Sequence, residues 1–153
     1  MSGLPTGVVV VTALIDGRPA GATVNAVSSL SLSPPLILAC LDQRSRTLEA
    51  VRMTRRFGVN VLHRGQEDSA RRFASKAAPP EKWESVAWRE RAGVPALDDV
   101  ALFAACELRA VHPGGDHEIA IGEVAEIELD PAAEPLVFWA GGYGAIGAEG
   151  FRG

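Results

Sequence analysis

The chain alternates short apolar runs with turn residues, a pattern that predicts many β-strands and few helices. The β-branched run Val8–Ala13 leads to the turn signal Asp16-Gly17, which indicates an opening hairpin. The apolar run Leu36–Leu41 has the length of a fully buried strand. Alternating apolar residues predict two further strands, at residues 57–62 and 102–111.

Residues 117–130 predict another long strand. Its apolar face is expected to carry Ile119, Ile121, Ala125, Ile127 and Leu129. His117 shares the phase of these residues, so its imidazole is expected to point into the protein. A last strand is predicted at Pro135–Trp139.

Two segments have helical character. Ser45 can cap a helix that continues through Leu48 and Val51. A second helix carries apolar residues at helical spacing, namely Ala70, Phe73, Ala74 and Ala77. The segment Ala78–Leu97 has no sustained period and is interpreted as an ordered but irregular loop. Many strands with two helices predict a mainly β protein, a closed or nearly closed β-barrel with flanking helices at its ends.

Composition fits a single globular domain over residues 1–153, with 47% apolar and 22% charged residues. The net charge of −4 argues against a nucleic-acid partner. No apolar run approaches the roughly 20 residues that span a bilayer, and no signal segment is recognisable, so we expect a cytoplasmic protein. Cys40 and Cys106 lie in apolar runs, and no Cys/His spacing suits a metal site.

Four blocks of sequence resemble, in order, those of the flavin reductase-like domain family: Pro5–Thr12, Gly21–Leu36, Gly114–Val124, and Pro135–Phe138 with Tyr143. The resemblance covers nearly the whole chain. It implies an FMN-binding split β-barrel of Greek-key type that forms a homodimer. It also implies the reductase component of a two-component monooxygenase, in which NADH or NADPH reduces FMN or FAD and a partner monooxygenase receives the reduced flavin.

Two features depart from the family pattern. Family members usually carry a helix before the first block, where this sequence has Met1–Leu4. The segment Ala77–Trp83 lacks the usual acidic-Lys-Phe pattern. The pair Lys82-Trp83 is the nearest match to it. The choice between FMN and FAD, and between NADH and NADPH, therefore stays open.

The resemblance places the flavin ring against the first half of the second block. The matching positions are Ala22, Thr23, Val24, Asn25 and Ala26. Small side chains there let the backbone approach a flat ring, and an asparagine amide offers both a donor and an acceptor. The alternative is an ordinary strand of small and polar residues that binds no ligand.

A phosphate site is predicted at Ser45, Arg46 and Thr47, which combine two hydroxyls, a guanidinium and the free N–H groups of a helix start. An ordinary helix cap beside a solvated arginine is an equally good interpretation. By resemblance, further flavin contacts come from Cys40, Leu41, Asp42, Arg72 and Phe73, with Lys76 close by.

The candidate catalytic residue is His117, which is expected to orient the nicotinamide over the flavin. Gly141, Gly142 and Tyr143 complete the predicted nicotinamide site by resemblance. Structural alternatives exist for each: a hydrogen-bonded histidine at the barrel mouth, a flexible glycine tail, and a tyrosine that packs the tail. A flavin carrier or sensor without turnover, and a flavin-free interaction module, remain alternative functions.

Overall fold

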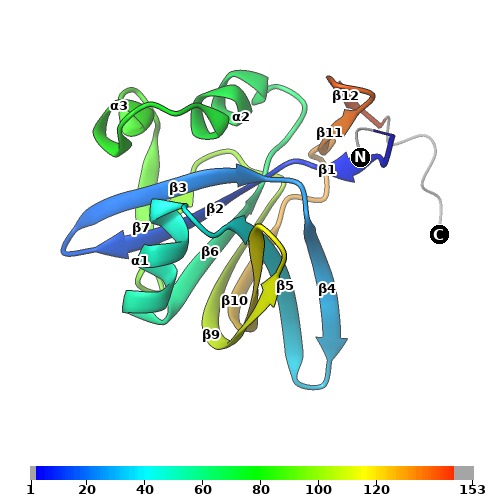
Figure 1. Cartoon of the computed structure of the whole chain (residues 1–153). Helices are drawn as coiled ribbons and strands as arrows, with labels where there is room; N and C mark the ends of the chain where they lie inside the picture. The colour runs from blue at the N-terminus through cyan, green and yellow to red at the C-terminus, as the bar shows by residue number, and fades with distance from the viewer. Residues whose placement is uncertain (1–2, 147–153) are drawn as a thin grey trace.

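The computed structural model describes residues 3–146, and its main element is an antiparallel seven-stranded sheet with the order β3-β2-β6-β9-β10-β5-β4 (Figure 1). The two edge strands follow one another in the chain, so the sheet curls into a barrel that is split between them. This arrangement confirms the predicted barrel. The strands are β2 (Val9–Ile15), β3 (Arg18–Val24), β4 (Val27–Leu32), β5 (Pro35–Asp42), β6 (Arg56–Val61), β9 (Leu102–Gly114) and β10 (His117–Leu129).

Two small sheets and three helices surround the barrel. The first small sheet has three strands, β1 (Thr6–Gly7), β11 (Leu136–Trp139) and β12 (Gly142–Ala145). The second is a hairpin of β7 (Trp88–Arg91) and β8 (Val94–Leu97). The helices are α1 (Arg46–Thr54), α2 (Glu67–Ala74) and α3 (Pro79–Trp83). Within residues 3–146, no helix has the length and apolarity needed to span a membrane.

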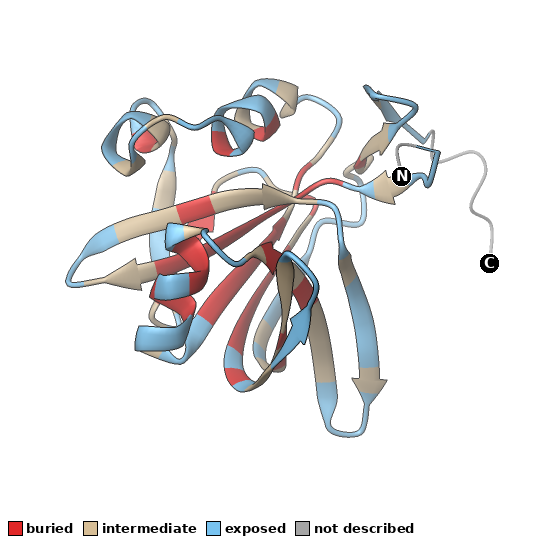
Figure 2. Ribbon diagram, in the orientation of Figure 1, coloured by how far each residue is buried: buried red, intermediate tan, exposed pale blue. Residues whose placement is uncertain are grey.

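The valine-rich strand β2 is buried on both of its faces, because two separate cores meet there (Figure 2). Val9 and Val11 point into the barrel, where α1 contributes Leu48 and Val51 to the same core. The opposite face of β2 packs beneath α2, in a cluster that contains Val8, Val10, Leu62, Ala70, Phe73, Trp83, Leu97 and Leu136. Double burial explains why the run is continuously apolar instead of alternating.

The predicted phase of β10 is wrong. Ala120 and Gly122 are the buried residues of this strand, and His117 lies in the opposite phase with its side chain 45% exposed. Gly122 has no room for a side chain, because the ring of Phe57 fills the space beside it. A bulge between Val124 and Glu126 then breaks the alternation along the strand.

The segment predicted as an irregular loop is mostly regular. It forms α3 and the β7–β8 hairpin, and the hairpin covers Phe103 and Ala105 on the outer face of β9. All four residues of β8 are buried, so the strand has no alternation that a sequence pattern could reveal. The buried carbonyl oxygen of Pro95 in β8 accepts a 2.6 Å hydrogen bond from the Thr12 hydroxyl.

Strand β5 is less buried than its continuous apolar run predicts. Ala39 and Leu41 are buried, whereas Leu36, Ile37 and Leu38 keep partial exposure. The reason is its position beside the edge strand β4, where the described residues leave part of the sheet uncovered.

Close packing at Gly122 generates a stability prediction. A Cβ atom built on this residue lies 2.5 Å from the Phe57 ring and 2.7 Å from Cys106 Cβ, closer than atoms in proteins approach. Gly122→Ala should therefore destabilise the protein by about 1–3 kcal/mol through overpacking, measured by denaturant unfolding. Gly144→Ala is the control, because no atom of residues 3–146 lies within 4 Å of a Cβ there. Equal stabilities of the two variants would contradict the packing described.

Candidate functional site

A pocket of about 700 Å³ opens between β3, the start of α1 and the segment that joins α2 to α3. We call it the basic pocket. Four cationic side chains line it, Arg44, Arg46, Lys76 and Lys82, against the single carboxylate of Asp42. An excess of positive charge of this kind favours an anionic ligand.

Strand β3 supplies a wall of small residues, Ala20, Gly21 and Ala22. A Cβ atom on Gly21 would lie 2.8 Å from the Phe73 ring, so the absence of a side chain lets α2 pack directly on the strand. The Thr23 hydroxyl donates a 2.7 Å hydrogen bond to the Ala70 carbonyl and ties the same two elements together. Along β3 the wall of the pocket therefore consists of backbone and small side chains.

The start of α1 forms the opposite side of the basic pocket. Ser45 caps the helix, accepting a 3.2 Å hydrogen bond from the Thr47 backbone N–H. The Asp42 carboxylate accepts a 2.7 Å hydrogen bond from the Arg44 backbone N–H, and the contacts with Arg44 hold the pKa of Asp42 below its ordinary value. First-turn N–H groups without intrahelical partners, next to a guanidinium, are suited to binding an anion.

Lys82 closes the pocket from the α3 side. Its ammonium donates a 3.0 Å hydrogen bond to the Phe73 carbonyl at the end of α2. Partial burial lowers the pKa of Lys82, because desolvation penalises its charged form. An anion in the basic pocket would compensate this penalty.

Seven of the thirteen predicted flavin contacts line the basic pocket. They are Ala22, Thr23, Asp42, Ser45, Arg46, Thr47 and Phe73. The pocket therefore joins the predicted ring segment to the predicted phosphate segment, although Thr23 and Ser45 are far apart in the chain.

The other six predicted contacts lie outside the pocket lining. Val24 and Leu41 pack with the barrel core, and Asn25 and Ala26 are exposed between β3 and β4. Cys40 is half-buried on β5, and its backbone N–H donates to the Ala26 carbonyl. Arg72 turns away toward α3, where it donates a 2.9 Å hydrogen bond to the Glu84 carbonyl.

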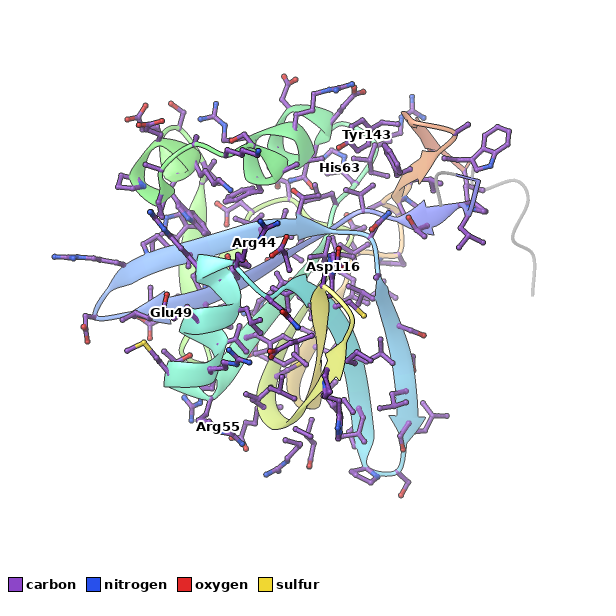
Figure 3. All side chains as sticks on the ribbon, in the orientation of Figure 1. Arg44, Glu49, Arg55, His63, Asp116 and Tyr143 are labelled. Atoms are coloured by element: carbon purple, nitrogen blue, oxygen red, sulfur yellow. The ribbon has the colours of Figure 1, made fainter. Side chains whose placement is uncertain are left out.

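The predicted nicotinamide residues do not line the basic pocket within this chain. Tyr143 packs edge-on against Phe138 with the Arg71 guanidinium over its ring, beside α2 and away from Arg44 and Asp116 (Figure 3). Gly141 and Gly142 are exposed at the β11–β12 turn.

His117 comes nearer to the basic pocket. It pairs across the β10–β5 ladder with Asp42, a residue of the lining. Its Nδ1 lies 2.8 Å from the Asp116 carboxylate, and this contact lowers the pKa of Asp116. The histidine thus neighbours a residue of the lining and has a partner that orients its ring.

Sequence reasoning missed several residues of the lining, above all Arg44, Pro79 and Lys82. Lys82 and Pro79 lie in the stretch without periodicity, where a proline pair at the start of a short helix was the available signal. Arg44 gave no signal, because one arginine in a turn is ordinary.

Comparison with known proteins agrees with the resemblance seen in the sequence. The family model described as "Flavin reductase like domain" matches residues 1–147. The "Flavin reductase (NADH)" of Kitasatospora aureofaciens is 40% identical over 148 residues, which are 94% of this chain and 76% of that protein. The reductase subunit HsaB of a flavin-dependent monooxygenase from Mycobacterium tuberculosis is 37% identical over 147 residues, 94% of this chain and 78% of the relative.

A solved structure agrees in fold. Nitrilotriacetate monooxygenase component B from Mycobacterium thermoresistibile superposes with a TM-score of 0.92 at 34% identity, covering 99% of this chain and 86% of that one. The family match over nearly the full length, the close relatives and the shared fold lead to one conclusion. This chain belongs to the flavin reductase-like domain family.

Proposed function

We propose that this protein uses reduced nicotinamide dinucleotide to reduce flavin, and that it supplies the reduced flavin to a partner monooxygenase. The observation that carries the proposal is the basic pocket, which combines a wall of small residues on β3 with a cationic helix start at Arg46. The names of the relatives support the reaction, since one is a flavin reductase that uses NADH and another is a monooxygenase reductase subunit.

The chain's own groups fit the flavin mononucleotide portion. The small side chain of Ala22 would lie against the flat ring, while the first turn of α1 and Arg46 would hold the phosphate. When bound, the flavin accepts a hydride from the dinucleotide, which leaves oxidised while the flavin leaves reduced. The protein's contribution is to bind both partners and to orient them.

Steady-state turnover tests this function. Purified protein should oxidise NADH or NADPH in the presence of added free FMN or FAD, followed anaerobically by bleaching of the flavin absorbance. A protein that binds flavin without turnover would be a carrier or sensor instead. One that takes up no flavin would contradict the proposal altogether.

The proposal includes a positioning role for His117 toward the nicotinamide. Its side chain is half-exposed, and its polar contact with Asp116 lies at the surface. Removal therefore leaves no buried group unpaired, so the stability cost that a buried histidine would carry is absent. Its pairing with Asp42 supports a location at the mouth of the basic pocket.

His117→Ala should lower turnover with reduced nicotinamide by about ten- to a thousandfold, the range expected when one to three orienting interactions are lost. Flavin affinity and the melting temperature should stay near those of the parent protein. His112→Ala on β9 is the control, since this residue lies outside the pocket lining. Normal turnover of His117→Ala with a lowered melting temperature would assign the histidine a structural role.

The proposed assembly is a homodimer through β4 and β5. A second pocket of about 570 Å³ lies there, lined by apolar residues that include Val27, Leu36 and Ile37. Leu32 is 89% exposed and Ile127 60% exposed at its edge. Apolar patches of this kind mark protein interfaces, and an edge strand beside them adds free backbone groups.

Leu32→Glu should shift the protein from dimer to monomer in light scattering, because a carboxylate would have to be buried in the interface. Met53→Glu is the matched control, an exposed apolar residue of α1 away from β4 (Figure 1). The interface is wrong if the parent protein is monomeric at working concentration or if both variants remain dimers.

A further inference from the structure

Three arginine side chains line an open pocket of about 590 Å³ at the C-terminal end of α1. Arg55 and Arg56 come from the junction between α1 and β6, and Arg109 comes from β9. The turn of the β7–β8 hairpin borders the pocket at Gly93. We call these three arginines the arginine patch.

The arginine patch carries positive charge that the neighbouring carboxylates do not compensate. Glu107 and Glu123 both contact Arg109, with shortest distances of 3.7 Å and 2.9 Å. Arg55 and Arg56 have no carboxylate partner within residues 3–146. The whole chain has a net charge of −4, so this local excess of positive charge is unusual for it. Two uncompensated guanidiniums in one pocket favour an anionic partner.

Both of these arginines are held in place by the fold. Arg55 is the C-cap residue of α1, and its Nη2 donates a 2.8 Å hydrogen bond to the Leu108 carbonyl on β9. The Arg56 side chain packs on the hairpin turn, where a Cβ atom at Gly93 would lie 2.8 Å from its Nη1. Side chains that are already ordered lose less conformational entropy when a partner binds.

The exposure of the patch favours a protein partner over a small molecule. All three arginines are exposed, whereas a small-molecule site buries most of the surface of its ligand. Arginine is also enriched at protein interfaces, where its planar donors pair with carboxylates. The arginine patch therefore fits the acidic side chains of another protein.

Helix α1 connects the arginine patch to the phosphate end of the basic pocket. Arg46 begins the helix and Arg55 follows its last residue, so the nine residues of the helix separate them by about 13 Å. Arg44 and Arg55 accordingly lie near opposite ends of α1 (Figure 3). A typical interface covers about 800 Å² on each partner, which is roughly 30 Å across. A protein docked on the patch would therefore lie close to the basic pocket.

We propose that the arginine patch docks an acidic segment of the partner monooxygenase. Docking there holds that protein beside the pocket that releases reduced flavin, which shortens the path of the flavin through water. The inference rests on the proposed function, because that function supplies the partner and the flavin that it receives.

The probe for this surface is an acetylated hexaglutamate peptide, titrated by calorimetry with and without saturating FMN. An ionic strength of about 0.1 M screens charges that are more than about 10 Å apart. Arg56→Gln is the test variant, because it removes a charge without breaking a hydrogen bond within residues 3–146. Arg18→Gln is the matched control, an exposed arginine outside the patch. Pyrophosphate is titrated in the same way as a small anion, and turnover with NADH and free FMN is measured on each protein.

The parent protein should bind the peptide equally well with and without FMN, and more tightly than it binds pyrophosphate in the presence of FMN. Arg56→Gln should weaken the peptide by about three- to tenfold, since an exposed charge pair contributes less than a buried one. Arg18→Gln should stay within about twofold of the parent. Turnover with free FMN should be unchanged in both variants, because neither residue lines the basic pocket.

Each other outcome overturns a definite part of the inference. Displacement of the peptide by FMN would place it in the basic pocket, and equal effects of the two substitutions would make its binding non-specific. Pyrophosphate that binds more tightly than the peptide, and loses affinity in Arg56→Gln, would make the patch a site for small anions.

Failure of this inference is distinguishable from failure of the proposed function. A parent protein that reduces flavin but does not bind the peptide overturns the docking surface alone. A parent protein that binds the peptide at the patch but does not reduce flavin overturns the proposed function, and with it the identity of the docked partner.

Discussion

The candidate site depends on how closely α2 and α3 approach strand β3 at Gly21. The rings of Phe73 and Trp83 occupy the space that a side chain would take, 2.8 and 3.1 Å from the position of a Cβ atom. Their own edge-on contact, with ring centroids 4.9 Å apart, makes the two helices pack as one unit. The hydrogen bond from Thr23 to the Ala70 carbonyl fixes the same unit along the strand.

This packing links the barrel core to the chemistry at its surface. Phe73 belongs to the core beneath α2 and also lines the basic pocket, so one side chain connects the two. Arg46 is held from the other side by α1, whose Leu48 and Val51 are anchored inside the barrel. The pocket is a space between two rigidly seated elements, which favours a preformed site.

Much of this organisation could be predicted from local patterns. The hairpin at Asp16-Gly17, the helix cap at Ser45 and the alternation of β9 each depend on neighbouring residues alone. The predicted ring segment and phosphate segment lie in the same pocket. Periodicity contains no information about such long-range proximity, and the resemblance to the family supplied it.

The errors have physical causes that lie outside local pattern. Apolar Ile119 and Ile121 suggested the inward face of β10, but Ala120 and Gly122 are the buried residues, and at Gly122 the Phe57 ring leaves no room for a side chain. Strand β8 showed no alternation because both of its faces are covered. Lys82 and Gly21 owe their importance to contacts with residues distant in the chain, which no spacing rule predicts.

The central claim is that Arg46 at the start of α1 binds the flavin phosphate, and the affinities of FMN and riboflavin for Arg46→Ala test it most directly. The two ligands share the ring and differ in the phosphate. Loss of a hydrogen bond to a charged group corresponds to about 1.5–3 kcal/mol, so FMN should bind roughly tenfold or more weakly, with riboflavin affinity nearly unchanged. Arg89→Ala, whose side chain pairs with Asp98 outside the pocket, should leave both affinities unchanged. Equal weakening of FMN and riboflavin by Arg46→Ala would contradict the account.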